Sequence, residues 1–558
     1  MKIFGRCLLA LVAATAARAQ SPPNVLMIVA DDLGVDRVGC YHEHPDPGHT
    51  PVIDGLAAKG LLFRRAWAEP VCSPSRASIL LGQDPFRHGI GQGLDQVADT
   101  LEMWTGDTTL PDAIAPDYTS VAFGKWHLSI DDFDSLHHPL KAGFAHFRGN
   151  LTIFPGFIGD GYYDFPKLVD GVLSESTTYN TTDIVNDALA MLPTLHEPWF
   201  SWLSFNAPHA PFHKPPANLH TFNLPPTVQA DVPLHMKAMT EAMDTEIGRL
   251  LSTLDPALLA RTIIVFVGDN GTDKPATTAP WLPSHAKGTI YDGGLRVPLI
   301  VSGPGVAVGA ECQALVNVTD LFATVAELAG KPHPTATDSV SIVPYFSNPA
   351  LPSVRSTLRA EIFEPEGFGP WTHHDVAARD GHFKLLRFWT QTSTHEELYD
   401  ITADTFEQNN LLLAPLSPDA AASYAVLEAA LFPKAETWNE VGEGIVGAHG
   451  EAHLSGSGPL TPGSLFSLHL TSAAPLKPMF LVIGWNWAGK LKKGGVLDPT
   501  TDFAETTLFT DSLGQLNGSA PWPPGLPSQF RMILQAWIVD PSTPMGLASS
   551  NGLIATTP

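Results

Sequence analysis

A cysteine at position 72 lies in a segment whose residue types suit the binding of an anion. The sequence CSPSRASILLG, which begins at Cys72, predicts a short helix with Ser73 as its N-cap, Pro74 at the first helical position and Gly82 at its end. Cys72 would then precede the helix N-terminus, where the helix dipole, the unpaired N–H groups and Arg76 all attract an anion. A nucleophile there would meet an anionic ester that is already bound. Standing alone, the segment fits an ordinary buried cysteine better.

Two pairs of residues with side-chain oxygen atoms follow apolar segments of strand length. Asp31 and Asp32 end the first such segment, and Asp269 and Asn270 end a later one. Three carboxylates in one crevice would repel one another strongly, so a cation is expected there. All-oxygen ligation suits a hard ion, Ca²⁺ or Mg²⁺, and the number of protein ligands favours Ca²⁺. One such pair would more simply cap a helix or form a turn, so the metal prediction depends on both pairs and on the wider set of motifs.

Four basic side chains complete the candidate site: Lys125, His127, His209 and Lys287. Lys125 and His127 follow a strand-like segment and lie two residues apart, so both can approach one crevice if the chain there is extended. His209 follows another such segment and is held between two prolines. Each of these residues alone would more often be a solvated lysine or a surface histidine. The position of Lys125, His127 and His209 after strand ends favours a functional role, and for the whole set the expectation also depends on the order of the motifs.

The elements that would position these residues form an alternating pattern up to about residue 340. Short apolar segments alternate with helix-like stretches, which predicts an α/β fold with a mostly parallel sheet covered by helices on both faces. In open α/β sheets, ligands bind at the carboxyl ends of the strands, so polar residues that follow different strands can share one site. The apolar segments are Val25–Ala30, Tyr118–Phe123, Trp199–Phe205, Thr262–Val267 and Val297–Val301.

The rest of the chain is predicted to form two smaller units. Residues 341–441 contain short strand candidates, such as Phe383–Phe388, and a helix candidate at Asp419–Leu431. They predict a small α+β subdomain that completes a catalytic domain of residues 20–340. Residues 442–558 are dominated by Gly, Ser, Pro and Leu, and turn residues separate their alternating segments, which predicts an appended β-sandwich. We find no catalytic constellation in that last unit.

The motifs occur together in the order of a known family. Cys-x-Pro-Ser-Arg, followed by Leu and Gly at the right spacing, matches the sulfatase signature. From about Asn24 to Leu411 the chain resembles the formylglycine-dependent sulfatases, the type I sulfatases of the alkaline phosphatase superfamily. Gly268 and Asp292 depart from the family's more frequent Ser and Glu, but neither is a proposed ligand. The other matching motifs are Thr50–Asp54, Gly124–Leu128, Pro208–Pro211, Gly268–Gly271, and Lys287 ahead of Tyr291–Gly294.

The resemblance implies a fold, a modification and a reaction. The fold would be an alkaline-phosphatase-like, mostly parallel sheet flanked by helices. A formylglycine-generating enzyme would oxidise Cys72 to an aldehyde, whose hydrate attacks the sulfur atom of an aryl or carbohydrate sulfate ester and later releases sulfate. One calcium ion would be held by Asp31, Asp32, Asp269, Asn270 and the modified Cys72.

The resemblance also implies a role for each basic residue. Arg76 would steady residue 72, and Lys125 and Lys287 would bind the sulfate group. His127 would be the base that collapses the sulfated intermediate. His209 would bind sulfate and help to protonate the leaving oxygen. The cations and the calcium ion would together stabilise the charge of the transition state.

Two other functions are compatible with parts of the sequence. A phosphatase or phosphonate monoester hydrolase of the same superfamily would share the sheet and the metal ligands, although the single-metal ligand set and the Leu-x-Gly ending favour sulfate. A glycan-binding or adhesion protein could carry an inert sulfatase-like domain beside its β-module, but the intact set of site residues argues against inertness. Rates on aryl sulfate and aryl phosphate would separate these alternatives.

Composition and the N-terminus indicate the setting of the protein. The 558 residues carry a formal net charge of -25, which argues against nucleic acid or an anionic membrane as a partner, because both reward dense Lys and Arg. Residues 1–19 have a basic start, an apolar middle and a small-residue end, which predicts a signal peptide cleaved near Ala19 and a secreted or periplasmic protein. The mature chain would keep three cysteines, Cys40, Cys72 and Cys312, which are too few for a disulfide scaffold.

Overall fold

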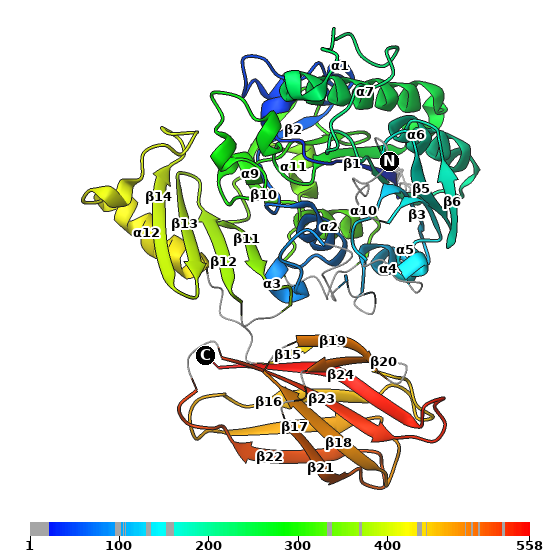
Figure 1. Ribbon diagram of the computed structural model, residues 1–558, viewed down its shortest axis with the longest axis vertical. Helices are drawn as coiled ribbons and strands as arrows, with labels where there is room; N and C mark the ends of the chain where they lie inside the picture. The colour runs from blue at the N-terminus through cyan, green and yellow to red at the C-terminus, as the bar shows by residue number, and fades with distance from the viewer. Residues whose placement is uncertain are drawn as a thin grey trace, which may run out of the picture.

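The fold is seen in a computed structural model (Figure 1). It describes residues 22–94, 102–103, 105, 108–129, 135–151, 161–331, 338–367, 371–431, 438–441, 444–485, 487–492, 495–499, 501, 503–526 and 530–557. The signal peptide predicted for residues 1–19 lies outside these residues. Over the described ranges, no helix is both long enough and apolar enough to cross a membrane.

A mixed sheet forms the centre of the larger body. Within the described residues it has ten strands, in the order β10-β2-β9-β8-β1-β7-β3-β4-β5-β6. The middle strands β8, β1, β7, β3 and β4 are all parallel to one another, as predicted. The strands are β1 (Asn24–Ala30), β2 (Leu61–Trp67), β3 (Thr119–Lys125), β4 (His146–Asn150), β5 (Phe165–Val169), β6 (Val172–Ser176), β7 (Trp199–Ser204), β8 (Thr262–Gly268), β9 (Leu299–Ser302) and β10 (Ala310–Asn317).

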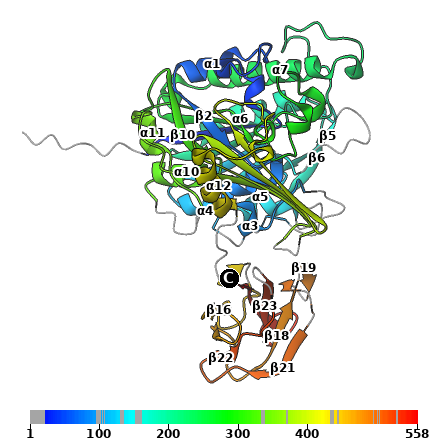
Figure 2. The ribbon, with the colours of Figure 1, turned by 90° about the vertical axis from the view of Figure 1, so that its left-hand side faces the viewer.

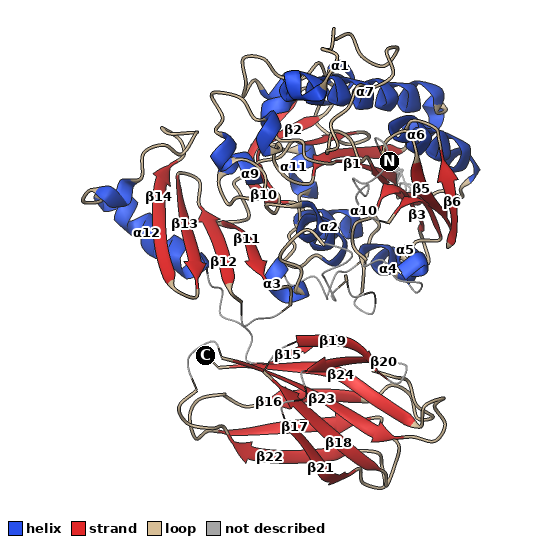
Figure 3. Ribbon diagram, viewed as in Figure 1, coloured by secondary structure: helices blue, strands red, loops and turns tan. Residues whose placement is uncertain are grey.

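Helices cover both faces of this sheet, as Figure 3 shows. Successive residues of β1 point to opposite faces: Val25 and Met27 belong to one hydrophobic cluster, and Leu26 and Ile28 to the other. Helices α2 (Cys72–Leu81), α4 (Leu110–Ile114) and α10 (Asp320–Leu328) pack on the first face, and α1 (Pro51–Ala58), α6 (Asn180–Met191) and α7 (Val232–Thr253) on the second. The predicted α/β fold is confirmed.

One predicted strand has a different direction from its neighbours. The segment Val297–Val301 contributes to β9, which runs antiparallel to β8 and β2. The chain after β8 stays at the carboxyl edge of the sheet, where Lys287 lies 2.6 Å from Asp32, before it enters β9. A strand that starts from this edge must run opposite to the parallel strands. The central sheet is therefore mostly, and not wholly, parallel.

A smaller antiparallel sheet stands beside the central one in Figure 1 and lies in front of the larger body in Figure 2. Its strands are in sequence order, β11-β12-β13-β14. Helix α12 (Pro418–Leu431), close to the predicted helix at Asp419–Leu431, packs on it through Leu427 and Leu431, which join the cluster of Val376 and Leu385. The strands are β11 (Leu358–Glu364), β12 (His373–Arg379), β13 (Phe383–Thr390) and β14 (Ser393–Asp400).

Two further antiparallel sheets form the C-terminal part of the chain, coloured orange to red in Figure 1. Leu454, Leu470 and Trp522 pack in one hydrophobic cluster with Leu534 and Ile538 from the other sheet, so the predicted β-sandwich is present. The first sheet contains β15 (Trp438–Val441), β24 (Leu547–Thr556), β23 (Arg531–Val539), β18 (Pro478–Gly484) and β21 (Phe503–Phe509), and the second contains β16 (His453–Ser457), β17 (Leu465–Thr471) and β22 (Leu516–Pro521). A separate hairpin is formed by β19 (Trp487–Lys492) and β20 (Gly495–Pro499).

Candidate active site

The carboxyl ends of four neighbouring strands, β8, β1, β7 and β3, bring the predicted site residues together. Asp31 and Asp32 follow β1, Lys125 ends β3, and Asp269 follows β8. Because these strands are adjacent and parallel, their polar followers meet at one edge of the sheet. The buried members of the set are Asp31, Asp32, Cys72, Arg76, Lys125, His127, Asp269 and Asn270, and His209 and Lys287 are partly buried.

Helix α2 starts at Cys72, with Val71 as its N-cap, and ends at Gly82 with a left-handed φ of 66°. The end at Gly82 is as predicted. The prediction of Ser73 as the N-cap is wrong, because the Ser73 hydroxyl makes tertiary hydrogen bonds instead. It donates to the carbonyl oxygen of His127 at 2.9 Å and accepts from the Leu94 N–H at 3.1 Å. Cys72 therefore lies in the first turn of the helix.

Arg76 extends from α2 under the crevice and is completely buried. Its Nε and Nη2 atoms donate to Asp269 Oδ2 at 2.9 and 2.8 Å, and its Nη1 atom donates to the Lys125 carbonyl oxygen at 3.0 Å. Nη1 also donates to Ser204 Oγ at 2.6 Å. Ser204, the last residue of β7, is not among the predicted site residues, although it is a polar residue at the end of an apolar strand. This network connects the cysteine helix to three strands.

Two lysines contact the first acidic pair. Lys125 Nζ lies 2.5 Å from Asp31 Oδ2 and 3.7 Å from the sulfur atom of Cys72. Lys287 Nζ lies 2.6 Å from Asp32 Oδ1. Asp32 has a left-handed φ of 63°, which Asp tolerates better than most residues. Each aspartate thus uses one oxygen atom for a lysine and presents the other to the crevice.

Three oxygen atoms of the site are buried and accept no hydrogen bond from any residue that the structure describes. They are Asp31 Oδ1, Asp32 Oδ2 and Asn270 Oδ1. The ligand atoms of Asp31, Cys72 and Asp269 also lie within 4.8 Å of one another. Buried oxygens without partners are costly unless an ion or another donor satisfies them, and oxygen donors suit a hard cation. The residues present therefore fit a calcium ion.

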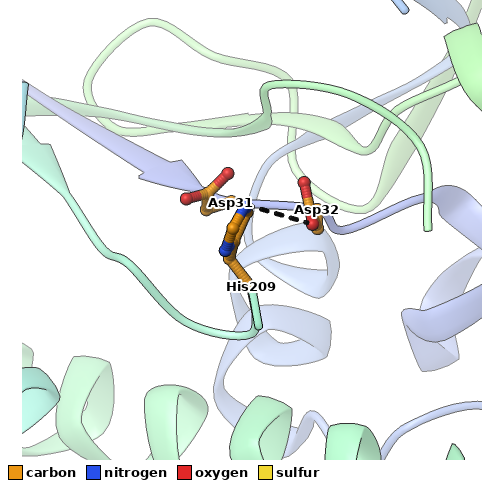
Figure 4. Close-up of side chains that lie close together, drawn as sticks. All are labelled: Asp31, Asp32 and His209. Carbon is orange, nitrogen blue, oxygen red and sulfur yellow. Dashed lines mark ion pairs between the residues drawn. The ribbon is translucent and has the colours of Figure 1, made fainter. Parts of the chain in front are cut away.

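His209 faces the acidic pair from the loop after β7 (Figure 4). Its Nε2 atom lies 3.8 Å from Asp32 Oδ2, and its Nδ1 atom lies 2.5 Å from the Ala210 carbonyl oxygen. Because a carbonyl oxygen only accepts, Nδ1 carries a proton and Nε2 is the atom that can exchange one with a ligand. Burial lowers the pKa of His209, against the opposing attraction of Asp32.

His127 is buried, two residues after the end of β3. Its Nε2 atom lies 3.1 Å from the Leu94 carbonyl oxygen, so Nε2 carries the proton and Nδ1 carries the lone pair. No residue in the described ranges hydrogen-bonds to Nδ1. Burial, and then the charge of Lys125, hold the pKa of His127 well below its usual value. The ring is therefore neutral near pH 7, which is the protonation state that a base requires.

Burial also controls the acid groups at the centre of the site. It raises the pKa of Asp269 to about 7, and the neighbouring Asp31 carboxylate adds to this effect. For Asp31, burial acts in the same direction and is the largest single effect, but the nearby basic groups, Lys125 first among them, together outweigh it and hold the pKa well below its usual range. Burial raises the pKa of the Cys72 thiol despite the nearby lysines, so the thiolate is scarce and the unmodified residue is a weak nucleophile.

A protein-family model described as Sulfatase matches residues 23–331, which is more than half of the chain. The chain belongs to the sulfatase family. It is a sulfuric ester hydrolase, and the predicted membership in the sulfatases of the alkaline phosphatase superfamily is confirmed. A second model, described as N-sulphoglucosamine sulphohydrolase, C-terminal, matches residues 284–425 of this sulfatase.

Curated relatives and solved structures agree with this assignment. The sulfatase is 31% identical over 418 residues to N-acetylgalactosamine-6-sulfatase of Sus scrofa, a match that covers 68% of this chain and 74% of the relative. It is 28% identical over 454 residues to arylsulfatase A of Homo sapiens, covering 73% and 86%. The crystal structure of Ps i-CgsB is similar with a TM-score of 0.60 and 27% identity, covering 70% of this chain and 89% of that one. Ps i-CgsB has also been solved in complex with k-i-k-neocarrahexaose.

Proposed function

We propose that this sulfatase hydrolyses a carbohydrate sulfate ester, with formylglycine at position 72 and one calcium ion beside it. The observation that carries the proposal is the group of three buried oxygens without hydrogen-bond donors, from Asp31, Asp32 and Asn270, next to Cys72. A carbohydrate substrate is supported by the names of the relatives, N-acetylgalactosamine-6-sulfatase among them, and by the oligosaccharide bound to Ps i-CgsB.

The calcium ligands would be Asp31, Asp32, Asp269, Asn270 and the modified residue 72. When bound, the ion supplies positive charge to the sulfate oxygens and to the developing transition state. Arg76 holds Asp269 through two hydrogen bonds, which leaves this carboxylate little freedom to turn away.

Cys72 suits modification better than direct attack. The raised pKa of its thiol makes the unmodified residue a weak nucleophile, whereas formylglycine supplies a hydrated aldehyde with two hydroxyl groups. The residue lies in the first turn of α2, where the helix dipole favours an anion, and Lys125 Nζ lies 3.7 Å from its sulfur atom. These features would hold the sulfate group of a substrate against residue 72.

The other residues bind the sulfate and move protons. Lys125 and Lys287 would exchange their carboxylate contacts for sulfate oxygens once the calcium ion neutralises Asp31 and Asp32. His209 would act in its protonated form, with the proton on Nδ1 held by the Ala210 carbonyl oxygen and the second proton donated from Nε2 to the leaving oxygen of the sugar. His127, with its lone pair on Nδ1, would accept the proton that must leave residue 72 when sulfate departs.

The setting of the protein is part of the proposal. Removal of a signal peptide near Ala19 would export the chain, after or during conversion of Cys72 by a formylglycine-generating enzyme. The mature chain would then comprise a catalytic domain of residues 20–340, an α+β subdomain of residues 341–441 and a β-rich module of residues 442–558.

Two measurements on one preparation test this proposal. The protein is made together with a formylglycine-generating enzyme, and mass spectrometry of the peptide that spans Cys72 should show an aldehyde in place of the thiol. The same sample is assayed on sulfated mono- and oligosaccharides, on 4-nitrophenyl sulfate and on 4-nitrophenyl phosphate, with Cys72→Ala as the inactive control. Full activity of protein that contains only thiol would refute the formylglycine mechanism. Faster hydrolysis of the phosphate than of any sulfate would favour a phosphate monoester hydrolase.

A further inference from the structure

The loop of residues 89–94 carries the carbonyl group that orients His127. The Leu94 carbonyl oxygen lies 3.1 Å from His127 Nε2 and so fixes both the ring and its tautomer. Leu94 is held in turn, because its N–H donates to Ser73 Oγ at 3.1 Å, and the same hydroxyl donates to the His127 carbonyl oxygen at 2.9 Å. A shift of this loop would therefore move the imidazole ring relative to residue 72.

The carboxylate of Glu366 holds this loop from outside. The N–H groups of Gly91 and Gln92 donate to its two oxygens at 2.7 and 2.8 Å. Phe363 lies so close that a Cβ atom at position 91 would be 2.2 Å from its ring, so only glycine permits this approach. The turn of residues 363–367, which begins with the last two residues of β11, and the loop of residues 89–94 thus fit together tightly.

Trp371 packs against this turn. Its indole N–H donates to the Gly367 carbonyl oxygen at 3.1 Å, and its ring centroid lies 4.7 Å from that of Phe363. Gly367 in turn donates its N–H to the Gly89 carbonyl oxygen at 2.7 Å. The indole ring therefore packs directly on the residues that touch the loop.

The C-terminal β-sandwich reaches this place through Arg531, the first residue of β23. The Arg531 guanidinium carbon lies 5.1 Å from the centroid of the Trp371 ring, within cation–π range. Burial lowers the pKa of Arg531 to about 10, against the opposing effect of the Glu361 carboxylate, so the side chain keeps its charge at neutral pH. In Figure 1 the sandwich lies beside the ends of β11 and β12, in agreement with this contact.

We propose that Glu366 and Arg531 are positioning residues for His127, so that docking of the β-sandwich contributes to the active site. Arg531 holds Trp371 over the turn of residues 363–367, Glu366 fixes the loop of residues 89–94, and the Leu94 carbonyl group fixes the imidazole ring. The inference rests on the proposed role of His127 as the base for release of sulfate. The sandwich thereby gains a function although it contributes no group that touches the substrate.

The first test measures the loop directly in the full-length, matured protein. Hydrogen exchange of the peptide that covers residues 89–94, followed by mass spectrometry, is compared for the wild type, Glu366→Gln and Arg531→Met. Glutamine offers only one acceptor oxygen, so one amide hydrogen bond is lost, and we expect exchange to be about tenfold faster in both variants. Lys477→Met is the matched control, because Lys477 pairs through its backbone with Thr510 inside the same sandwich. Unchanged exchange in Arg531→Met would overturn the proposed contribution of the sandwich.

The second test measures the chemical step with 4-nitrophenyl sulfate under pre-steady-state conditions. Release of nitrophenol precedes release of sulfate, so a poorly positioned base should leave the first step intact and slow the second. For Glu366→Gln and Arg531→Met, we expect a burst of nitrophenol close to one per active site. The steady-state rate that follows should be about fivefold to tenfold below that of the wild type. A variant that is merely less well folded would instead lose burst amplitude and rate together, and that result would contradict a positioning role.

The variant His127→Ala distinguishes a failure of this inference from a failure of the proposed function on which it rests. The substitution should give the same stoichiometric burst with a far lower steady-state rate, while exchange of the loop of residues 89–94 changes little. If His127→Ala shows no burst, the proposed role of His127 is wrong, and the kinetic part of the inference fails with it. The exchange experiment would still decide whether Glu366 and Arg531 hold the loop.

Discussion

The hydroxyl group of Tyr162 donates to the carbonyl oxygen of His209 at 2.8 Å and lies 2.7 Å from the carbonyl oxygen of Asn206. The His209 N–H also donates to the Asn206 carbonyl oxygen at 2.9 Å, so the tyrosine closes a tight turn that presents the imidazole to the crevice. Tyr162 is completely buried, and its ring centroid lies 4.1 Å from that of His213. One buried hydroxyl group thus fixes the backbone of the residue proposed as the acid.

Substitution of Tyr162 by phenylalanine should therefore lower activity without removing any group that touches the substrate. We expect kcat/KM on a sulfated sugar to fall about tenfold, which corresponds to the loss of one buried hydrogen bond. Tyr163→Phe is the control, because the neighbouring hydroxyl bonds the Lys214 carbonyl oxygen instead. Equal effects of the two substitutions in steady-state kinetics would argue that Tyr162 has no specific relation to His209.

Substitution of His209 by alanine should harm a poor leaving group most. Nitrophenolate departs without a proton, whereas a sugar alkoxide is far more basic and depends on the acid, so we expect an additional loss of about 10²-fold on the sugar ester. Comparison of the loss in kcat/KM on 4-nitrophenyl sulfate with the loss on a sulfated sugar isolates the contribution of His209 as an acid. If the two losses are equal, His209 only binds the anion, and Lys287 is the next candidate for the acid.

Replacement of two of the three carboxylates should remove the metal. In the double variant Asp31→Asn and Asp269→Asn, the site loses two of its charges, so we expect calcium to be absent by elemental analysis and most activity to be lost. Asp46→Asn provides a control, since Asp46 is an exposed partner of Lys237 away from the crevice. Activity that survives both the double substitution and thorough chelation would show that the metal assignment is wrong.

A buried ion cluster beside the site predicts a stability change that depends on pH. Lys384 Nζ lies 2.9 Å from Asp292 and 2.7 Å from Glu407, and all three side chains are buried. Lys384→Met would leave the buried Glu407 carboxylate without its cation and Asp292 with Arg379 at 3.9 Å, and it should cost about 3–5 kcal/mol in the free energy of unfolding. The control substitution Lys59→Met, at an exposed lysine, should change the free energy of unfolding little.

The sign of the pH dependence follows from Glu407. Burial already raises the pKa of Glu407 to about 7, even though Lys384 opposes this. A group whose pKa is raised in the folded state stabilises the fold at low pH and loses that contribution as the pH rises through its folded value. Without Lys384 the pKa of Glu407 is raised further. Thermal unfolding should therefore show that Lys384→Met loses more stability at pH 8 than at pH 5. A loss that is independent of pH would contradict the assignment of charge to this cluster.

Much of the site could be predicted from the sequence because its residues occupy recognisable local patterns. Apolar segments of strand length define β1, β3, β7 and β8, and parallel strands must bring the residues at their carboxyl ends to one edge of the sheet. This rule is enough to locate Asp31, Lys125 and Asp269. The segment around Cys72 also predicts the start of a helix and the resemblance to the family, because both depend on residues close together in the chain.

Contacts between distant parts of the chain were decided only by the tertiary structure. Ser73 has the residue type of an N-cap, but its hydroxyl bonds His127 and Leu94 instead, so the helix begins earlier than its own sequence indicates. The same holds for Glu366, which bonds the amides of a loop more than 270 residues before it, and for Arg531, which lies against Trp371. Local sequence specifies which groups are available, whereas their partners depend on how separate elements pack, and packing is a property of the whole chain.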